Sequence, residues 1–380
     1  MKLIYSIIAI IIITIFISCS PYETAQNTID TTTTTGITVE LFRNNNPLYS
    51  QYANIKSNDL PIRNLLIDIT PDLQWFKSNA FNPPTGVNGQ FRTRCEISHI
   101  SNDDPFTKPN QPGQSHIHMF FGNTNTDAYS TPDSIVNSGG STCDGFELNR
   151  SSYWFPVMQD SNGNIRIPNN MMLYYKGEGI SPPQEGYTPI PQGLKMIAGN
   201  AKASSAQPSA YDFGFSCGDM FTIPSQTTIP TCSGDKLMEK ITYPRCWNGR
   251  TDFDSSDAIN FVVYPSESYS TGLCPPDHPY VLPEIQVLFD WNIGSDTTDG
   301  WHLSSDHNSD IGGTTMHADY FGGWNKKITE NWTKYCLDNE WNCQTGFIGN
   351  KNLLPTNNGL FNSLNPTPIL YSNSGPIIIK

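Results

Sequence analysis

The sequence has little charge and few basic residues. Only 15% of its 380 residues are Asp, Glu, Lys or Arg, and 22 Lys and Arg stand against 35 Asp and Glu, a formal net charge of −13. An excess of acidic residues disfavours nucleic acid and other polyanionic partners. We therefore expect no nucleic-acid partner. A local basic pocket remains compatible with this balance.

The cysteines include no Cys-x-x-Cys pair, and the chain has no Walker-type phosphate loop. These absences argue against a zinc ribbon and a P-loop nucleotide site. Apart from Cys19, an even number of cysteines remains, which favours disulfides in an oxidising compartment. They are Cys95, Cys143, Cys217, Cys232, Cys246, Cys274, Cys336 and Cys343. Many pairings are open, and we expect neighbours along the chain to pair, above all Cys336 with Cys343 across the shortest loop.

The N-terminus has the pattern of an export signal. A lysine is followed by an apolar run of 15 residues, Leu3–Ile17, and by small residues. We expect a signal peptide over residues 1–19 and a flexible tether over residues 20–36. Cys19 resembles the lipid-modified cysteine of bacterial lipoproteins, with free secretion as the alternative. The expected location is outside the cell, with membrane contact only through this lipid.

Short apolar runs between clusters of Pro, Gly, Asn and Asp predict a mainly β chain. The runs with the composition of strands are 153–158, 171–176, 194–199, 259–265 and 284–291. A helix is predicted over 323–337, where Trp324, Ile328 and Trp332 recur at helical spacing. The expected fold is a sandwich or jelly-roll-like single domain with long loops, few short helices and disulfide bonds.

Two of only seven histidines stand one residue apart, in a stretch that has the pattern of a strand. Residues i and i+2 of a strand point to the same face, so His116 and His118 would lie side by side, with Ile117 and Met119 packed behind. Such a pair is half of a transition-metal site, or a base with its orienting partner. Two partly buried structural histidines are the alternative.

The pattern His-x-(His or Asp)-x-Phe occurs a second time near the C-terminus. There His317 and Asp319 occupy the positions of His116 and His118. If both stretches lie on strands facing one cleft, three imidazoles and a carboxylate form a four-point site for one divalent transition metal. These four residues are therefore candidate metal ligands and candidate catalytic groups.

A second constellation has the residue types that hold carbohydrate. Asn149, Arg150, Tyr153 and Trp154, with Tyr175 further on, offer aromatic faces for sugar rings and polar groups for hydroxyls or a carboxylate. In a polysaccharide lyase, Arg150 would neutralise a uronate while a histidine or tyrosine removes a proton. The alternative is that the aromatic residues build the core and Arg150 caps a loop.

Several motifs together resemble a known family. In chain order they are "CEISHISNDDP", "QPGQSHIHMFFGN", "STCDGFELNRSSYW", "LKMIAGNA", "YPRCWNGR", "CPPDHPYVLPEI" and "HADYFGGW". They resemble DUF1996, a domain of unknown function found in secreted fungal and bacterial proteins, sometimes beside carbohydrate-binding modules. The resemblance covers roughly residues 85–345, leaving an N-terminal extension, 37–84, that packs on this body and a C-terminal extension, 346–380. It implies secretion, a disulfide-bearing fold and a cell-wall context, but no reaction.

The sequence thus favours an exported protein that acts on extracellular or cell-wall polysaccharide as a hydrolase or lyase. Its site would be centred on histidines that act as bases or hold a metal. Two alternatives stay open: a non-catalytic carbohydrate-binding or structural protein of the cell surface, and a surface metal-binding protein.

Overall fold

The computed structural model describes most of the chain after the expected leader. The described residues are 52–69, 89–177, 185–207, 213–218, 226–234, 236–265, 273–294, 296–307, 311–356, 369–372 and 375–378. All of them belong to one compact unit, Thr35–Lys380. The expected signal peptide, the lipidation of Cys19 and the tether lie outside the described residues.

The largest sheet has six strands in the order β10-β11-β15-β8-β2-β18. They are β2 (Gln90–Cys95), β8 (Asn170–Lys176), β10 (Phe213–Cys217), β11 (Lys236–Thr242), β15 (Glu284–Asn292) and β18 (Asn342–Thr345). All pairs are antiparallel except β18 with β2. Burial alternates along β2, as expected of a strand with one face in a core.

The second sheet has five antiparallel strands in the order β3-β4-β5-β17-β9. They are β3 (Ile97–Ser101), β4 (His118–Gly122), β5 (Ser152–Pro156), β9 (Lys195–Gly199) and β17 (His317–Phe321). Every residue of β3, β4, β5 and β17 is buried, so both faces of this sheet are covered. We call the face that carries His118, Phe120, Trp154, His317 and Asp319 the histidine face.

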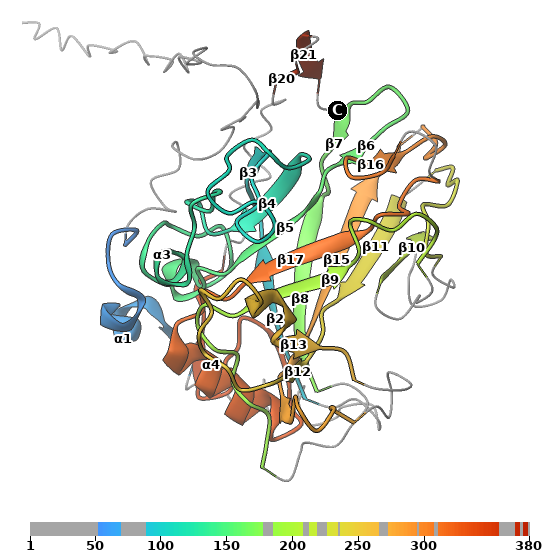
Figure 1. Cartoon of the computed structure of the whole chain (residues 1–380). Helices are drawn as coiled ribbons and strands as arrows, with labels where there is room; N and C mark the ends of the chain where they lie inside the picture. The colour runs from blue at the N-terminus through green and yellow to red at the C-terminus, as the bar shows by residue number, and fades with distance from the viewer. Residues whose placement is uncertain are drawn as a thin grey trace, which may run out of the picture. The chain divides into compact units, whose positions relative to one another are not determined.

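The opposite face of the five-stranded sheet packs on the six-stranded sheet. Phe121 and Phe155 place their rings 5.4 and 4.7 Å from the ring of Phe289 on β15. The hydroxyls of Tyr153 and Tyr175 form a hydrogen bond between the sheets. In Figure 1, β17 and β9 cross β8 and β15 at a wide angle. The two sheets form a sandwich, so the mainly β prediction is confirmed.

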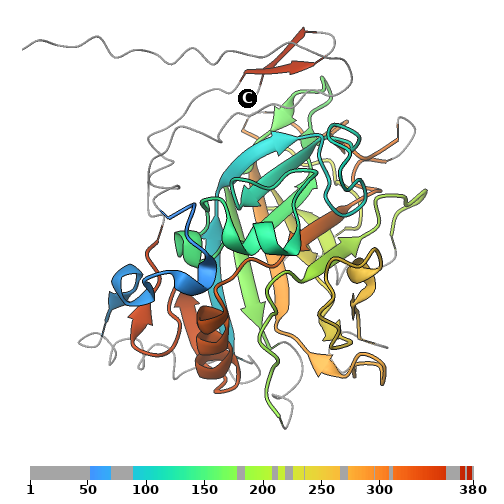
Figure 2. The same cartoon turned by 60° about the vertical axis from the view of Figure 1, so that its left-hand side comes forward.

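Helices are few and short. They are α1 (Ile62–Leu65), α3 (Pro132–Asn137), α4 (Lys326–Trp332), a π-helical turn (Thr333–Leu337) and 3-10 turns at Ser57–Asp59, Phe146–Leu148 and Ala258–Asn260. Thr131 caps α3 through a reciprocal bond with Ser134, and Ile135 and Val136 pack on the histidine face. Figure 2 shows α3 in front of that sheet. No helix among the described residues is long and apolar enough to cross a membrane.

Outside the two large sheets, the short strands of the described residues form two three-stranded sheets and two strand pairs. They are β6 (Met158–Gln159), β7 (Ile165–Arg166) and β16 (His302–Leu303) in one sheet, β12 (Cys246–Trp247), β13 (Val262–Val263) and β14 (Tyr280–Val281) in another, β1 (Ile67–Asp68) with β19 (Asn352–Leu353), and β20 (Ile369–Ser372) with β21 (Gly375–Ile378). The strand predicted over 259–265 is wrong in extent. A 3-10 turn occupies 258–260, and only Val262 and Val263 form ladder bonds.

The predicted helix over 323–337 is present as α4 and the π-helical turn that follows it. Asn325 caps its start by accepting a hydrogen bond from the backbone N–H of Lys327. The ring of Trp332 stacks on that of Phe91 at 5.4 Å, which places the helix against β2. The helical spacing in the sequence therefore marked a face that packs on the six-stranded sheet.

Four disulfides join cysteines that are neighbours along the chain, as predicted. The pairs are Cys95–Cys143, Cys217–Cys232, Cys246–Cys274 and Cys336–Cys343. Disulfides of this number indicate an extracellular, oxidising location.

In the described part of the N-terminal extension, the carbonyl of Tyr52 accepts a hydrogen bond from Arg150, and β1 pairs with β19.

Candidate metal centre

The two histidine stretches lie on strands that flank β5. Because β5 is antiparallel to both β4 and β17, those two strands run in the same direction. In register, Trp154 of β5 lies opposite Phe120 of β4 and Asp319 of β17. His118 and His317 each begin their strand, one step further along, on the same face. The two copies of the sequence pattern are therefore offset by two residues in the fold: His317 lies level with His118, not with His116, and Asp319 lies level with Phe120.

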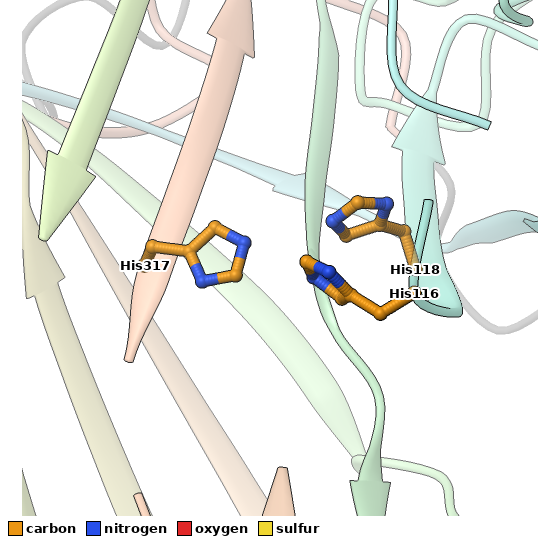
Figure 3. Close-up of side chains that lie close together, drawn as sticks. All are labelled: His116, His118 and His317. Atoms are coloured by element: carbon orange, nitrogen blue, oxygen red, sulfur yellow. The ribbon is translucent and has the colours of Figure 1, made fainter. Parts of the chain in front are cut away.

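The three imidazoles meet at one point. His116, His118 and His317 each offer one ligand nitrogen, and these nitrogens all lie within 4.8 Å of one another. The ring centroids of His116 lie 4.1 Å from those of His118 and 5.0 Å from those of His317. Figure 3 shows the rings of His116 and His118 turned toward the ring of His317 on β17. Nitrogens this close suit ligation of one ion at about 2.0–2.1 Å.

His118 is held in a fixed orientation by a loop. Its Nδ1 lies 3.0 Å from the backbone carbonyl of Asp103. A carbonyl only accepts, so Nδ1 carries the proton and Nε2 keeps a free lone pair. The carboxylate of Asp103 in turn accepts a hydrogen bond at 2.9 Å from the backbone N–H of Gly113, across the same loop. The Nε2 of His118 is buried and has no hydrogen-bond partner in the described structure.

His317 is held in the same way. Its Nδ1 lies 2.8 Å from the carbonyl of Thr315, so its Nε2 is also the nitrogen with a free lone pair. The carboxylate of Asp306 fixes this turn by accepting hydrogen bonds from the N–H of Gly313 at 2.7 Å, the N–H of Thr315 at 2.9 Å and the hydroxyl of Thr315 at 2.7 Å. Each strand histidine is therefore oriented by a carbonyl in a loop that an aspartate holds in place.

His116 differs from the other two. It lies two residues before β4 rather than within it, and it is half-buried while His118 and His317 are buried. Its Nε2 lies inside and has no hydrogen-bond partner, and no hydrogen bond to either ring nitrogen is found among the described residues. As predicted, Met119 is buried in the core and Ile117 packs against it.

Burial keeps the imidazoles neutral. Desolvation, and then the neighbouring histidines, lower the pKa of His116 to about 2, and desolvation and His317 lower the pKa of His118 to about 3. Desolvation also lowers the pKa of His317, although Thr315, Asp104 and Asp306 oppose the shift. Neutral imidazoles are the form that binds metal, so protons do not compete for this site near neutral pH.

Asp104 supplies a buried negative charge beside the histidines. It is 3% exposed, and its charge raises the pKa of both His116 and His317. Its carboxylate accepts hydrogen bonds from the backbone N–H groups of Phe106 and Thr107 at 2.8 and 3.0 Å. A fixed carboxylate at this position offsets part of the charge that a divalent ion would bring into the interior.

Asp319, predicted as a fourth ligand, is not among the groups that converge within 4.8 Å. Its side chain lies two residues along β17 from His317, a step of about 6.5–7 Å on a strand. It is 1% exposed. Desolvation, and then the charge of Asp104, raise its pKa well above the usual range.

The residues predicted to hold carbohydrate are all buried. Tyr153, Trp154 and Tyr175 are each 0% exposed, so no sugar ring can stack on them in this structure. Arg150 donates to the carbonyls of Gly139, Val136 and Tyr52 at 2.9, 3.1 and 2.6 Å, which occupies its guanidinium. Asn149 is also 0% exposed. These placements match the alternative of a core with a loop-capping arginine.

One further motif is explained by the fold. Residues 214–218 read Gly-x-Ser-x-Gly, a pattern that nucleophilic hydrolases place at a sharp strand-to-helix turn. Here Ser216 lies buried within β10, and Cys217 beside it is disulfide-bonded to Cys232. The serine lies in a regular ladder with β11 and not on an exposed turn. The pattern therefore marks no nucleophile.

Comparison with known families identifies the chain. Residues 104–324, more than half of the sequence, match the family described as "Domain of unknown function (DUF1996)". The protein belongs to this family, over a narrower range than the residues 85–345 expected from the motifs. No curated protein and no solved structure matches the chain. All three histidines and Asp319 lie inside the matched range.

Proposed function

We propose that the protein is an extracellular metalloprotein that binds one divalent transition metal at His116, His118 and His317. The observation that carries this proposal is the convergence of three neutral imidazoles within 4.8 Å, with two buried Nε2 atoms that have no hydrogen-bond partner in the described structure. Buried polar atoms in proteins are almost always bonded, so orphaned nitrogens that face one another fit an absent ion.

The donor set favours certain ions. Three nitrogens without a thiolate suit zinc or copper, and also iron, manganese or cobalt, better than calcium or magnesium, which prefer oxygen. Structural zinc sites use four protein ligands, whereas catalytic sites keep three and leave a position open. The three-histidine set has the ligand count of a catalytic centre. A bound ion would act as a Lewis acid and would lower the pKa of a water at the open position.

We extend the proposal to a substrate outside the cell, with extracellular or cell-wall polysaccharide as the class the sequence favours. The disulfides and the family membership support an extracellular location. The choice of a glycan substrate rests on the sequence alone, because the described residues present no exposed aromatic platform for a sugar ring. The metal-loaded protein should therefore be screened against neutral and acidic glycans. Absence of cleavage with every metal tested would favour metal capture without turnover.

Metal content is the experiment that tests the site. The full chain, exported to an oxidising compartment and purified without chelator, is assayed by elemental mass spectrometry beside a His116→Ala/His118→Ala variant. We expect close to one metal per chain in the wild type and almost none in the variant. A His278→Ala/His302→Ala variant is the matched control, since these histidines lie outside the cluster. Metal-free wild type, or equal metal in all three, would refute the proposal.

A further inference from the structure

A buried carboxyl beside the histidines has no structural explanation. Asp319 is 1% exposed, and its Oδ2 has no hydrogen-bond partner among the described residues. Its main chain is well bonded, since its carbonyl accepts from the hydroxyl of Tyr243 at 2.9 Å and its strand pairs on both sides. The fold therefore uses the backbone at this position, whereas the carboxyl contributes nothing that an apolar side chain would not.

The apolar surroundings of the Asp319 carboxyl lower the free energy of unfolding of the protein. On the histidine face, Trp154 lies opposite Asp319 on β5, and Phe321 follows two residues later on the same strand. Phe120, Trp154 and Phe321 form one apolar cluster there. The negative charge of Asp104 further disfavours an ionised carboxylate at Asp319. A polar group buried among aromatic rings without a partner destabilises a fold, so its presence indicates a role that needs it.

The position of Asp319 points to that role. It faces the same side as His317, one ladder step away, which is too far to converge with the three imidazoles but close enough to reach a molecule bound beside them. The Nε1 of Trp154, opposite Asp319, is also buried and has no hydrogen-bond partner in the part of the chain that the structure describes. Two polar groups without a described partner therefore belong to paired residues of neighbouring strands, on the histidine face and one ladder step from His317.

We infer that Asp319 holds, by a hydrogen bond from or to its carboxyl, the small oxygen- or nitrogen-bearing ligand that fills the open metal position, with the indole N–H of Trp154 as a second contact. This inference rests on the proposed metal site and assigns to it a binding position for a further ligand, which we call the ligand seat. The seat suits a water molecule, a small anion, or the polar group of a substrate presented to the ion. Asp319 is then a group of the centre without being a metal ligand.

The test uses the full chain loaded with Cu(II) and titrated with azide, followed by charge-transfer absorption. Asp319→Leu should keep copper but weaken azide binding about tenfold, the loss expected for one hydrogen bond. Asp319→Asn, which keeps a donor and an acceptor, should lose less. Ser152→Ala is the matched control, because Ser152 Oγ is equally buried and unpartnered on the same face but lies opposite Phe321, one step further from the histidines.

A second measurement separates function from structure. Because the buried carboxyl is unpartnered, Asp319→Leu should raise the Tm of the metal-free protein, by about 2–5 °C. A lower Tm would make the residue structural and overturn the inference, as would unchanged azide affinity in Asp319→Leu or loss of copper from it. In all three cases the metal site itself would stand. Wild type that binds no copper or other metal would overturn both proposals.

Discussion

The three histidines of the centre are built in two different ways. His118 and His317 start neighbouring strands of one sheet, are buried, and donate from Nδ1 to carbonyls in loops that Asp103 and Asp306 hold. His116 precedes its strand, is half-buried, and has no such hydrogen bond in the described structure. In the proposed metal site, two ligands would thus be positioned before an ion arrives, and the third would adjust to it.

This difference has an energetic consequence. A ligand side chain that is already oriented loses little conformational entropy when the ion binds. For a mobile side chain, the entropy lost on ordering offsets part of the free energy gained from the metal–nitrogen bond. The strand histidines should therefore contribute most of the affinity. His116, at the exposed side of the centre, should contribute less and should govern the entry and exit of the ion.

The largest expected effect is loss of either strand histidine. A four-ligand zinc site is worth about 10–16 kcal/mol, so one preorganised ligand accounts for about 2.5–4 kcal/mol. We expect His118→Ala and His317→Ala each to weaken metal affinity on the order of 1,000-fold, measured by competition with a chromophoric chelator. Near-wild-type affinity in either variant would remove that residue from the centre.

A smaller loss is expected for the loose histidine. His116→Ala should weaken the affinity by about 100-fold or less, since two oriented imidazoles remain, and should speed metal release to a chelator. Stopped-flow release and equilibrium competition measure the two effects. An affinity loss equal to that of His118→Ala would end the distinction between the two kinds of ligand.

Acid should destabilise the metal-free protein through the same buried histidines. The folded pKa of His118 is about 3 and its ordinary value is 6.5, so from pH 6.5 downward only the unfolded chain binds this proton, and the free energy of unfolding falls until about pH 3. Between pH 7 and 5 the loss is about 2 kcal/mol for a buried histidine.

Urea unfolding of the metal-free wild type, His118→Ala and His116→Ala at pH 7 and 5 measures this loss. His118→Ala and His116→Ala should each lose less stability than the wild type on acidification, because burial lowers the pKa of both imidazoles below 5 and each substitution removes a group that only the unfolded chain protonates in this range. Glu96 acts in the opposite direction, since burial raises its pKa to about 7, but it is common to all three proteins and cancels. Equal pH dependence in all three would contradict the assignment.

The smallest effect is expected from the aspartate that holds the His317 loop. Asp306→Asn replaces one of the two acceptor oxygens by an NH2 group, so the side chain can accept from Gly313 or from Thr315 but not from both, and the Thr315 carbonyl loses its fixed position. We expect a loss of metal affinity of about tenfold and a changed Cu(II) EPR spectrum. Asp160→Asn, in a similar turn that accepts from the N–H groups of Asn162 and Asn164, is the control and should change neither.

Much of the centre could be predicted from the sequence because its ligands share a local pattern. A His-x-His or His-x-Asp pattern places alternate side chains on one face where the chain is extended, and this predicted that the two stretches share a site. The pattern could not predict that His116 precedes its strand or that Asp319 lies outside the cluster. The orienting groups could not be predicted, because Asp103 and Asp306 act through hydrogen bonds that close loops, and acidic pairs in turns are common. The burial of Arg150 was equally out of reach, since its acceptors Tyr52, Val136 and Gly139 come from separate segments.

The fold was predictable where the inward-facing positions of a strand are apolar. The runs at 171–176 and 284–291 became β8 and β15, whereas β2 and β11 were missed. Their inward positions include Thr93 and Glu239, polar residues that break the apolar alternation on which the prediction depends. Tertiary pairing with β8 and β15 overrides that local signal.

The Cys95–Cys143 disulfide crosses the border of the family match, which begins at residue 104. A chain trimmed to residues 104–324 would leave Cys143 as an unpaired thiol and would lack both β2 and β3. The backbone edges of β8 and of β4, the strand that begins with His118, would then lie open to other chains. Exposed edges pair between molecules and promote aggregation. Soluble production of this family's domain therefore calls for boundaries wider than its recognisable sequence.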